Sequence, residues 1–160
     1  MTKLSAAFGS AFDKDTLRIR SFVLNGHTFK VKVPLTAETD AMFERVKIID
    51  EEKVEKYYVD LSKDFIDNKE RYADDADVVY QDDDILVKGT SLKVTARNKA
   101  QTENRITEMV RLLVPENQDF DMSTVTYEEI DELFPFSVQL ELLEEINKTI
   151  APGYSSTRGK

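Results

Sequence analysis

Residues 17–33, LRIRSFVLNGHTFKVKV, have the pattern of an antiparallel β-hairpin. The Asn25-Gly26 pair supplies the two positive-φ positions of a type I′ turn, which matches the twist of paired strands. Apolar side chains alternate with basic ones at Leu17 to Arg20 and again at Phe29 to Val33. Because successive side chains of a strand point to opposite faces, the pattern predicts one apolar face and one basic face.

The predicted basic face is a candidate partner-binding surface. Its four cationic side chains are Arg18, Arg20, Lys30 and Lys32. Docking of an acidic neighbour is one role, and solubility or protection of a strand edge by lysines is another. The face lacks the interleaved aromatic residues of a single-strand binder, so nucleic acid is not the expected partner. A second copy of the chain, with its acidic segment, is a sensible neighbour on electrostatic grounds.

Helices are expected on the C-terminal side of Pro34, which ends the hairpin because it has no N–H to donate. Apolar residues at helical spacing indicate helices over residues 37–49 after a Thr36 N-cap, over 51–72, over 92–114 after a Ser91 N-cap, over 127–133 after a Thr126 capping box, and from Pro135 to Ala151. Within residues 51–72, Tyr57-Tyr58-Val59 is open to a strand interpretation.

Short strands are expected at Val78-Val79-Tyr80 and Ile85-Leu86-Val87, which could pair with each other or extend the hairpin's sheet. Together, the predicted strands and helices indicate an α+β fold: a small antiparallel sheet built on an N-terminal β-hairpin, packed with three to five α-helices. Residues 1–16 are expected to be a flexible N-terminal arm, residues 17–151 a single α+β domain, and residues 152–160 a flexible C-terminal tail.

Composition narrows the classes of function. The chain has 160 residues, of which 41% are apolar and 33% charged, and its formal net charge is -9. That charge repels nucleic-acid phosphate and anionic lipid headgroups, so neither nucleic acid nor membrane is an expected partner. The first residues lack the apolar core of a signal peptide, and no apolar run approaches the ~20 residues of a membrane span. A cytoplasmic location is therefore predicted.

The sequence offers few groups for catalysis or metal binding. There is no cysteine, one histidine (His27) and five scattered glycines, which give no phosphate-binding loop. Six aspartates in the acidic segment could supply oxygen ligands to a divalent cation: Asp74, Asp75, Asp77, Asp82, Asp83 and Asp84. A calcium loop counted from Asp75 would place Tyr80 at the glycine position and Leu86 at the glutamate position, so the motif fails. We expect no enzyme activity, no cofactor and no metal site; a hydrolase using carboxylates and a metal is the remaining enzymatic alternative.

The final helix carries a second candidate partner-binding surface, made of Phe134, Phe136 and Leu140. Leu140 lies off the side formed by Val138, Leu142, Leu143 and Ile146, which is expected to be buried. The aromatic residues at the helix entry could staple the helix to the core or present a groove to a partner helix. The sequence leaves both interpretations open.

The order of a short hairpin around an Asn-Gly turn, a helix, and further helices resembles the tail assembly chaperones of long-tailed bacteriophages, including the lambda type. The matching stretches are residues 22–31, Leu35 with the helix after it, residues 104–110 and residues 134–138. The resemblance implies a protein of the bacterial host cytoplasm that binds and solubilises the tape measure protein, helps recruit tail tube subunits, and forms oligomers. The alternative is another small phage or bacterial interaction module, such as a virion connector component or an acidic inhibitor that mimics DNA.

Overall fold

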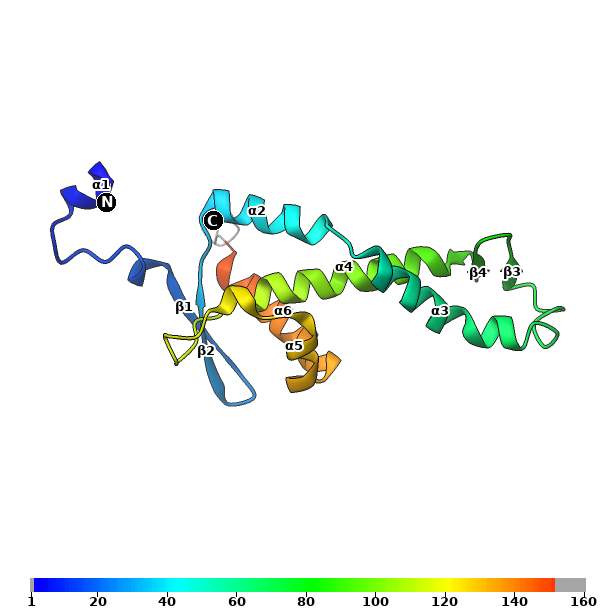
Figure 1. The fold of residues 1–160 in the computed structure, drawn as a ribbon. Helices are drawn as coiled ribbons and strands as arrows, with labels where there is room; N and C mark the ends of the chain where they lie inside the picture. Colours follow the sequence, from blue (N-terminus) through cyan, green and yellow to red (C-terminus); the bar gives the residue numbers. More distant parts are fainter. Residues whose placement is uncertain (1, 152–160) are drawn as a thin grey trace, which may run out of the picture. The chain divides into compact units, whose positions relative to one another are not determined.

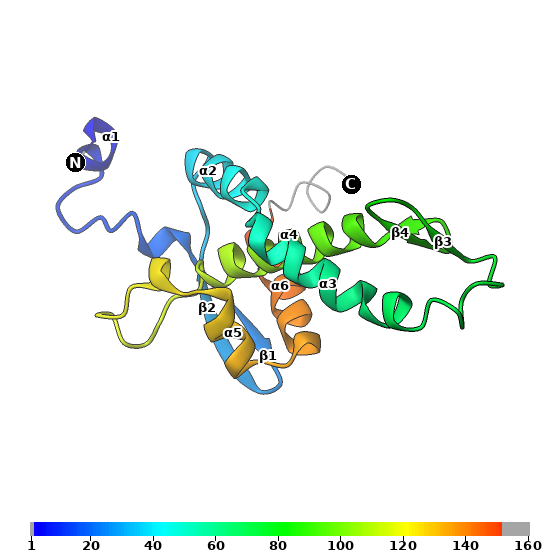
Figure 2. The same cartoon turned by 45° about the vertical axis from the view of Figure 1, so that its right-hand side comes forward.

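The computed structural model describes residues 2–151, and these residues form an α+β fold (Figures 1 and 2). The helices are α1 (Lys3–Ala7), α2 (Thr36–Lys47), α3 (Glu51–Asp67), α4 (Leu92–Val110), α5 (Tyr127–Leu133) and α6 (Phe136–Ile150). The strands are β1 (Ile19–Leu24), β2 (His27–Lys32), β3 (Val78–Tyr80), β4 (Ile85–Val87) and β5 (Thr90–Ser91). Two 3-10 turns, η1 (Thr16–Arg18) and η2 (Met122–Thr124), complete the described elements. The predicted α+β class is confirmed.

The hairpin forms as predicted. β1 and β2 pair antiparallel with Phe22 opposite Phe29. Asn25 and Gly26 take φ values of 50° and 82°, which are the left-handed conformations that the two-residue turn requires. The strands form a two-stranded sheet, and β3, β4 and β5 form a separate three-stranded one. Of the two pairings open for the later strands, pairing with each other is the one observed.

The prediction that one face of the hairpin is basic is wrong. Arg20 lies opposite Val31, whereas Lys30 and Lys32 lie opposite Ser21 and Ile19. Since residues two apart in a strand share a face, Arg20 is on the same face as buried Phe22, and the two lysines are on the other. The apolar alternation changes phase between Ile19 and Phe22, and the buried phenyl ring fixes which phase faces the core.

Close contacts group residues 2–42 and 106–151 into one compact unit, which we call unit 1, and Phe43–Arg105 into another, unit 2. The core of unit 1 lies between the hairpin and α6, which contacts both strands (Figure 1). Its buried side chains are Phe22, Val31, Met42, Met109, Leu142 and Ile146. Full burial of the Leu142 and Ile146 side chains contributes about 1.5–3 kcal/mol each.

The helix α4 ends at Val110, four residues before the predicted end at Val114. The residues that follow leave the helix and pair with β2 instead. The Val114 N–H donates to the carbonyl of Lys30 at 2.8 Å, and the Lys32 N–H donates to that of Leu112 at 2.9 Å. These bonds cover the edge of β2 that faces away from β1, and they place Leu113 beside Val31.

Unit 2 contains α3, which confirms a helix in this segment and excludes a strand at Tyr57-Tyr58-Val59. The helix ends at Asp67, five residues before the predicted end at Tyr72. The buried side chains of its core are Val54, Ala96 and Ala100. Ser91 caps α4 as predicted, with its Oγ accepting from the Val94 N–H at 3.1 Å. Thr36 is not the N-cap of α2 but its first residue; the Leu35 N–H before it donates to Glu38 Oε1 at 2.9 Å.

The domain boundaries expected from the sequence stay predictions. Residues 3–7 of the N-terminal segment form α1, whose Thr2 and Ser5 make a reciprocal capping box. The tail predicted at residues 152–160 lies outside the described residues.

Candidate functional site

An apolar groove opens in unit 1 between β2, the segment after α4, and α5. Its volume is about 700 Å³. The lining residues are His27, Thr28, Phe29, Lys30, Val110, Leu113, Val114, Pro115, Glu116, Gln118, Phe120, Met122, Val125, Glu129, Ile130, Leu133 and Phe134. We refer to this surface as the apolar groove.

Two large apolar side chains of the groove remain in contact with water. Leu133 is 71% exposed and Phe120 is 45% exposed. Exposed apolar side chains gathered in one concave surface are typical of a site that binds a partner. Behind them lies a closed cluster of Ile106, Val110, Val125 and Ile130, so the floor of the groove is packed against a core.

Arg111 fixes the segment that forms one wall of the groove. Its Nε and Nη2 donate to the carbonyl of Val125 at 2.9 and 2.8 Å, and its Nη1 lies 3.2 Å from Glu108 Oε1. Asp121 holds the 3-10 turn η2 by accepting from the N–H and the hydroxyl of Ser123. These bonds hold the wall in place without a bound partner.

The helix α5 forms another wall of the groove. Thr126 caps it by accepting from the Glu129 N–H at 3.3 Å. Gln139, which is fully buried on α6, donates from Nε2 to Asp131 Oδ1 at 2.9 Å and to the carbonyl of Phe134 at 2.8 Å. A side chain of α6 therefore fixes the end of α5 and the backbone of Phe134, which lines the groove.

The structure separates the three apolar residues predicted as a partner-binding surface. Phe134 lines the apolar groove. Phe136 and Leu140 are 52% and 41% exposed on α6 and are not among the lining residues. Phe134 also packs against the core, as the stapling interpretation expects, and binding of a partner helix by this segment stays a prediction.

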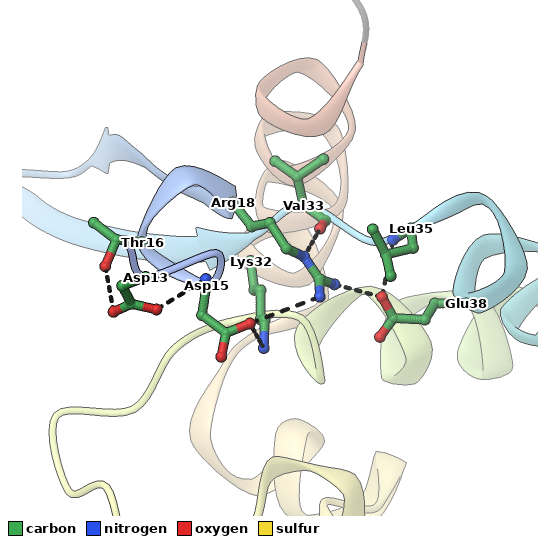
Figure 3. Close-up of polar contacts among 8 residues, drawn as sticks. All are labelled: Asp13, Asp15, Thr16, Arg18, Lys32, Val33, Leu35 and Glu38. Carbon is green, nitrogen blue, oxygen red and sulfur yellow. Dashed lines mark hydrogen bonds and ion pairs between the residues drawn. The ribbon is translucent and has the colours of Figure 1, made fainter. Parts of the chain in front are cut away.

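The four basic residues that were predicted to form one surface also make separate contacts. Lys30 lines the apolar groove. Arg20 donates from Nη1 to the carbonyl of Thr149 near the end of α6, at 3.0 Å. Arg18 and Lys32 contact acidic residues of their own chain (Figure 3).

Figure 3 shows how Arg18 joins the start of the hairpin to α2. Its Nε donates to the carbonyl of Val33 at 2.8 Å, and its Nη2 pairs with Glu38. Lys32 Nζ lies 3.3 Å from Asp15 Oδ1. The Leu35 N–H, and after it the Arg18 guanidinium, hold the pKa of Glu38 below its ordinary value, outweighing partial burial. Arg18 and Lys32 thus have acidic partners within the chain, and binding of another molecule by the four basic residues stays a prediction.

The acidic segment of unit 2 contains one carboxylate with a structural role. Asp84 Oδ1 accepts from the N–H groups of Ile85 and Lys93 at 2.8 and 3.2 Å, and Oδ2 accepts from the Ser91 hydroxyl. Asp82 and Asp83 are exposed, and Asp83 Oδ2 lies 3.3 Å from Lys93 Nζ. Within residues 2–151, no group of three or more His, Asp or Glu side chains is placed to hold a metal ion.

No protein-family model matches this chain, and no curated protein or solved structure gave a significant match. The resemblance to tail assembly chaperones accordingly depends on the sequence of residues 22–31, 104–110 and 134–138 and of Leu35 with its following helix. None of the helices between residues 2 and 151 has the length and apolar character needed to cross a membrane.

Sequence reasoning missed most of the apolar groove. Residues 116–124 have the composition of a polar loop, yet Phe120 and Met122 of that loop line the groove. The available signal was the presence of an aromatic and a methionine among acidic residues, which a solvated loop does not need. Helical spacing correctly places Leu133 in α5, but its exposure depends on how α5 packs, and spacing alone does not give that.

Proposed function

We propose that this protein is a tail assembly chaperone of a long-tailed bacteriophage. It binds and solubilises the tape measure protein, and it helps recruit tail tube subunits during tail morphogenesis in the host cytoplasm. The apolar groove of unit 1 is the observation that carries the proposal, together with the sequence resemblance. Its exposed Leu133 and Phe120 offer anchoring contacts to an apolar client segment.

The physical requirements of such a chaperone match the composition of the chain. A long helical client presents apolar stripes that associate unless they are covered, and a groove between secondary-structure elements covers such a stripe. The net charge of -9 keeps the complex soluble by mutual repulsion. A second copy of the chain is a further proposed partner, which would let several chaperones coat one client.

Co-expression with a long helical tape measure protein tests the proposal. The soluble fraction of the client should rise with the chaperone, and the two should co-purify. Leu133→Ser should reduce that fraction, because it removes an exposed anchor of the groove. The matched control is Ile66→Ser on α3, since Ile66 is 57% exposed but does not line the groove.

A client that is no more soluble with the chaperone than without it would contradict the proposal. Equal effects of Leu133→Ser and Ile66→Ser would contradict the role of the groove. Recruitment of the tail tube subunit is tested separately, by adding it to the purified complex and measuring its retention by size-exclusion chromatography.

A further inference from the structure

We infer that the apolar groove selects amphipathic helices whose flanks are cationic. The inference rests on the proposed function, because it specifies the chemistry of the client segment that the same groove takes. It is carried by the charges around the groove, where carboxylates outnumber lysine and arginine side chains.

Seven carboxylates lie on α5 and on the segment before η2, two of the elements that form the groove's walls. They are Glu116, Asp119, Asp121, Glu128, Glu129, Asp131 and Glu132, and all are exposed. Glu116 and Glu129 line the groove itself. Within the part of the chain that the structure describes, Glu116, Asp119 and Glu132 form no ion pair with a lysine or arginine of the chain.

Among the described residues that line the groove, Lys30 of the hairpin is the only lysine or arginine. Arg111 lies nearby, but its guanidinium donates hydrogen bonds to the carbonyl of Val125 and forms an ion pair with Glu108. A helix bound in the groove would therefore meet the carboxylates of α5 and of the segment before η2, which a lysine or arginine flank would neutralise.

The apolar lining fits the other face of such a helix. Phe120, Met122 and Leu133 provide aromatic, flexible and branched side chains along one surface. Methionine adapts to different apolar shapes, which suits a groove that takes more than one segment of a long client. Helix-in-groove binding places apolar anchors at positions i, i+3 or i+4, and i+7, and leaves the flanks facing the rims.

Two synthetic peptides test the inference on the full-length protein. Each has about 15 residues, near the length at which isolated helices become marginally stable. They share one apolar face of leucine and phenylalanine, and their flanks are all lysine in one and all glutamate in the other. Fluorescence anisotropy should give a dissociation constant at least about tenfold lower for the lysine peptide at low salt. The difference should shrink when salt screens the charges.

Protein variants assign the effect to the groove. The double variant Glu116→Gln with Glu132→Gln should weaken binding of the lysine peptide several-fold, while Glu141→Gln on the exposed side of α6 should not. Leu133→Ser should weaken that binding as well, through loss of an apolar anchor. The urea midpoint of each variant should equal that of the parent protein. A change in peptide affinity then reflects binding and not loss of folded protein.

Equal affinity for the two peptides would overturn the inference while leaving the chaperone proposal intact, since client solubility is measured independently. Failure of both peptides to bind would also overturn it, because the groove would then not take an amphipathic helix. Tighter binding of the lysine peptide that is insensitive to Glu116→Gln with Glu132→Gln and to Leu133→Ser would place the binding elsewhere and would equally overturn it.

Discussion

The phenol of Tyr127 on α5 donates a hydrogen bond to Gln139 Oε1 on α6 at 2.7 Å. Gln139 is fully buried, and its amide also donates to Asp131 and to the carbonyl of Phe134. One side chain thus satisfies three polar groups around the junction of two helices. Because a buried amide is costly without partners, this set of bonds fixes the geometry of the junction as well as its stability. The junction forms one wall of the apolar groove.

The substitution Gln139→Leu should lower the free energy of unfolding by about 2–3 kcal/mol, because it removes the donor to the Phe134 carbonyl within a buried region. Tyr127→Phe should cost about 1 kcal/mol, since it removes one neutral hydrogen bond. Urea denaturation measures both. The double variant should be less destabilised than the sum, because both substitutions break the same bond.

Asn147→Leu, on the exposed side of α6, is the control for the change in polarity and should stay within about 0.5 kcal/mol of the parent. Strict additivity of Tyr127→Phe and Gln139→Leu would contradict the coupling of the two side chains.

Arg18 is predicted to contribute to stability rather than to partner binding. Arg18→Gln should lower the free energy of unfolding by about 1 kcal/mol, because it removes the guanidinium that bonds Val33 and Glu38. Lys30→Gln should be neutral within about 0.5 kcal/mol, since Lys30 is an exposed surface residue. Thermal or urea unfolding separates the two. A neutral Arg18→Gln would show that the guanidinium does not stabilise the hairpin and α2.

Local chemistry made the hairpin predictable from the sequence. The Asn25-Gly26 turn needs two left-handed residues in succession, and few other pairs adopt that conformation at so little cost. The helix N-caps at Ser91 and Thr126 were predictable because a cap depends on residues within one turn of it. The same reasoning misplaced the cap of α2 by one residue, since Thr36 is the first residue of that helix.

Features that depend on distant contacts were not predictable. Periodicity could not show that the phase of β1 changes after Ile19, because the phase is set by packing of Phe22 against α6 and its neighbours. Nor could it show that residues 111–114 leave α4 to pair with β2. The groove depends on both events, so only Phe134 and Lys30 of its lining could be predicted as partner-binding residues.

Gly26→Ala tests the turn directly. Gly26 has a φ of 82°, a region that costs a residue with a Cβ about 1–2 kcal/mol. The free energy of unfolding should fall by about that amount, as measured by urea denaturation. Asn25→Gly is the control, since glycine adopts positive φ freely and the change should have a much smaller effect.

Asp84 should make unit 2 sensitive to acid. Partial burial tends to raise the pKa of Asp84, but the Ser91 hydroxyl, the N–H groups of Ile85 and Lys93, and the charge of Lys93 together hold it below the ordinary value of 3.8. A carboxyl whose pKa is lower in the folded state contributes stability above its unfolded-state pKa. That contribution should therefore be complete at neutral pH and decline as the pH falls below about 3.8.

The substitution Asp84→Asn should lower the free energy of unfolding by about 1–2 kcal/mol at pH 7 and reduce the decline at low pH. Urea midpoints at several pH values measure this, and Asp82→Asn, at an exposed neighbouring carboxyl, is the control and should leave the midpoint at pH 7 unchanged. An identical acid dependence in Asp84→Asn and the parent would show that other carboxyls control the response.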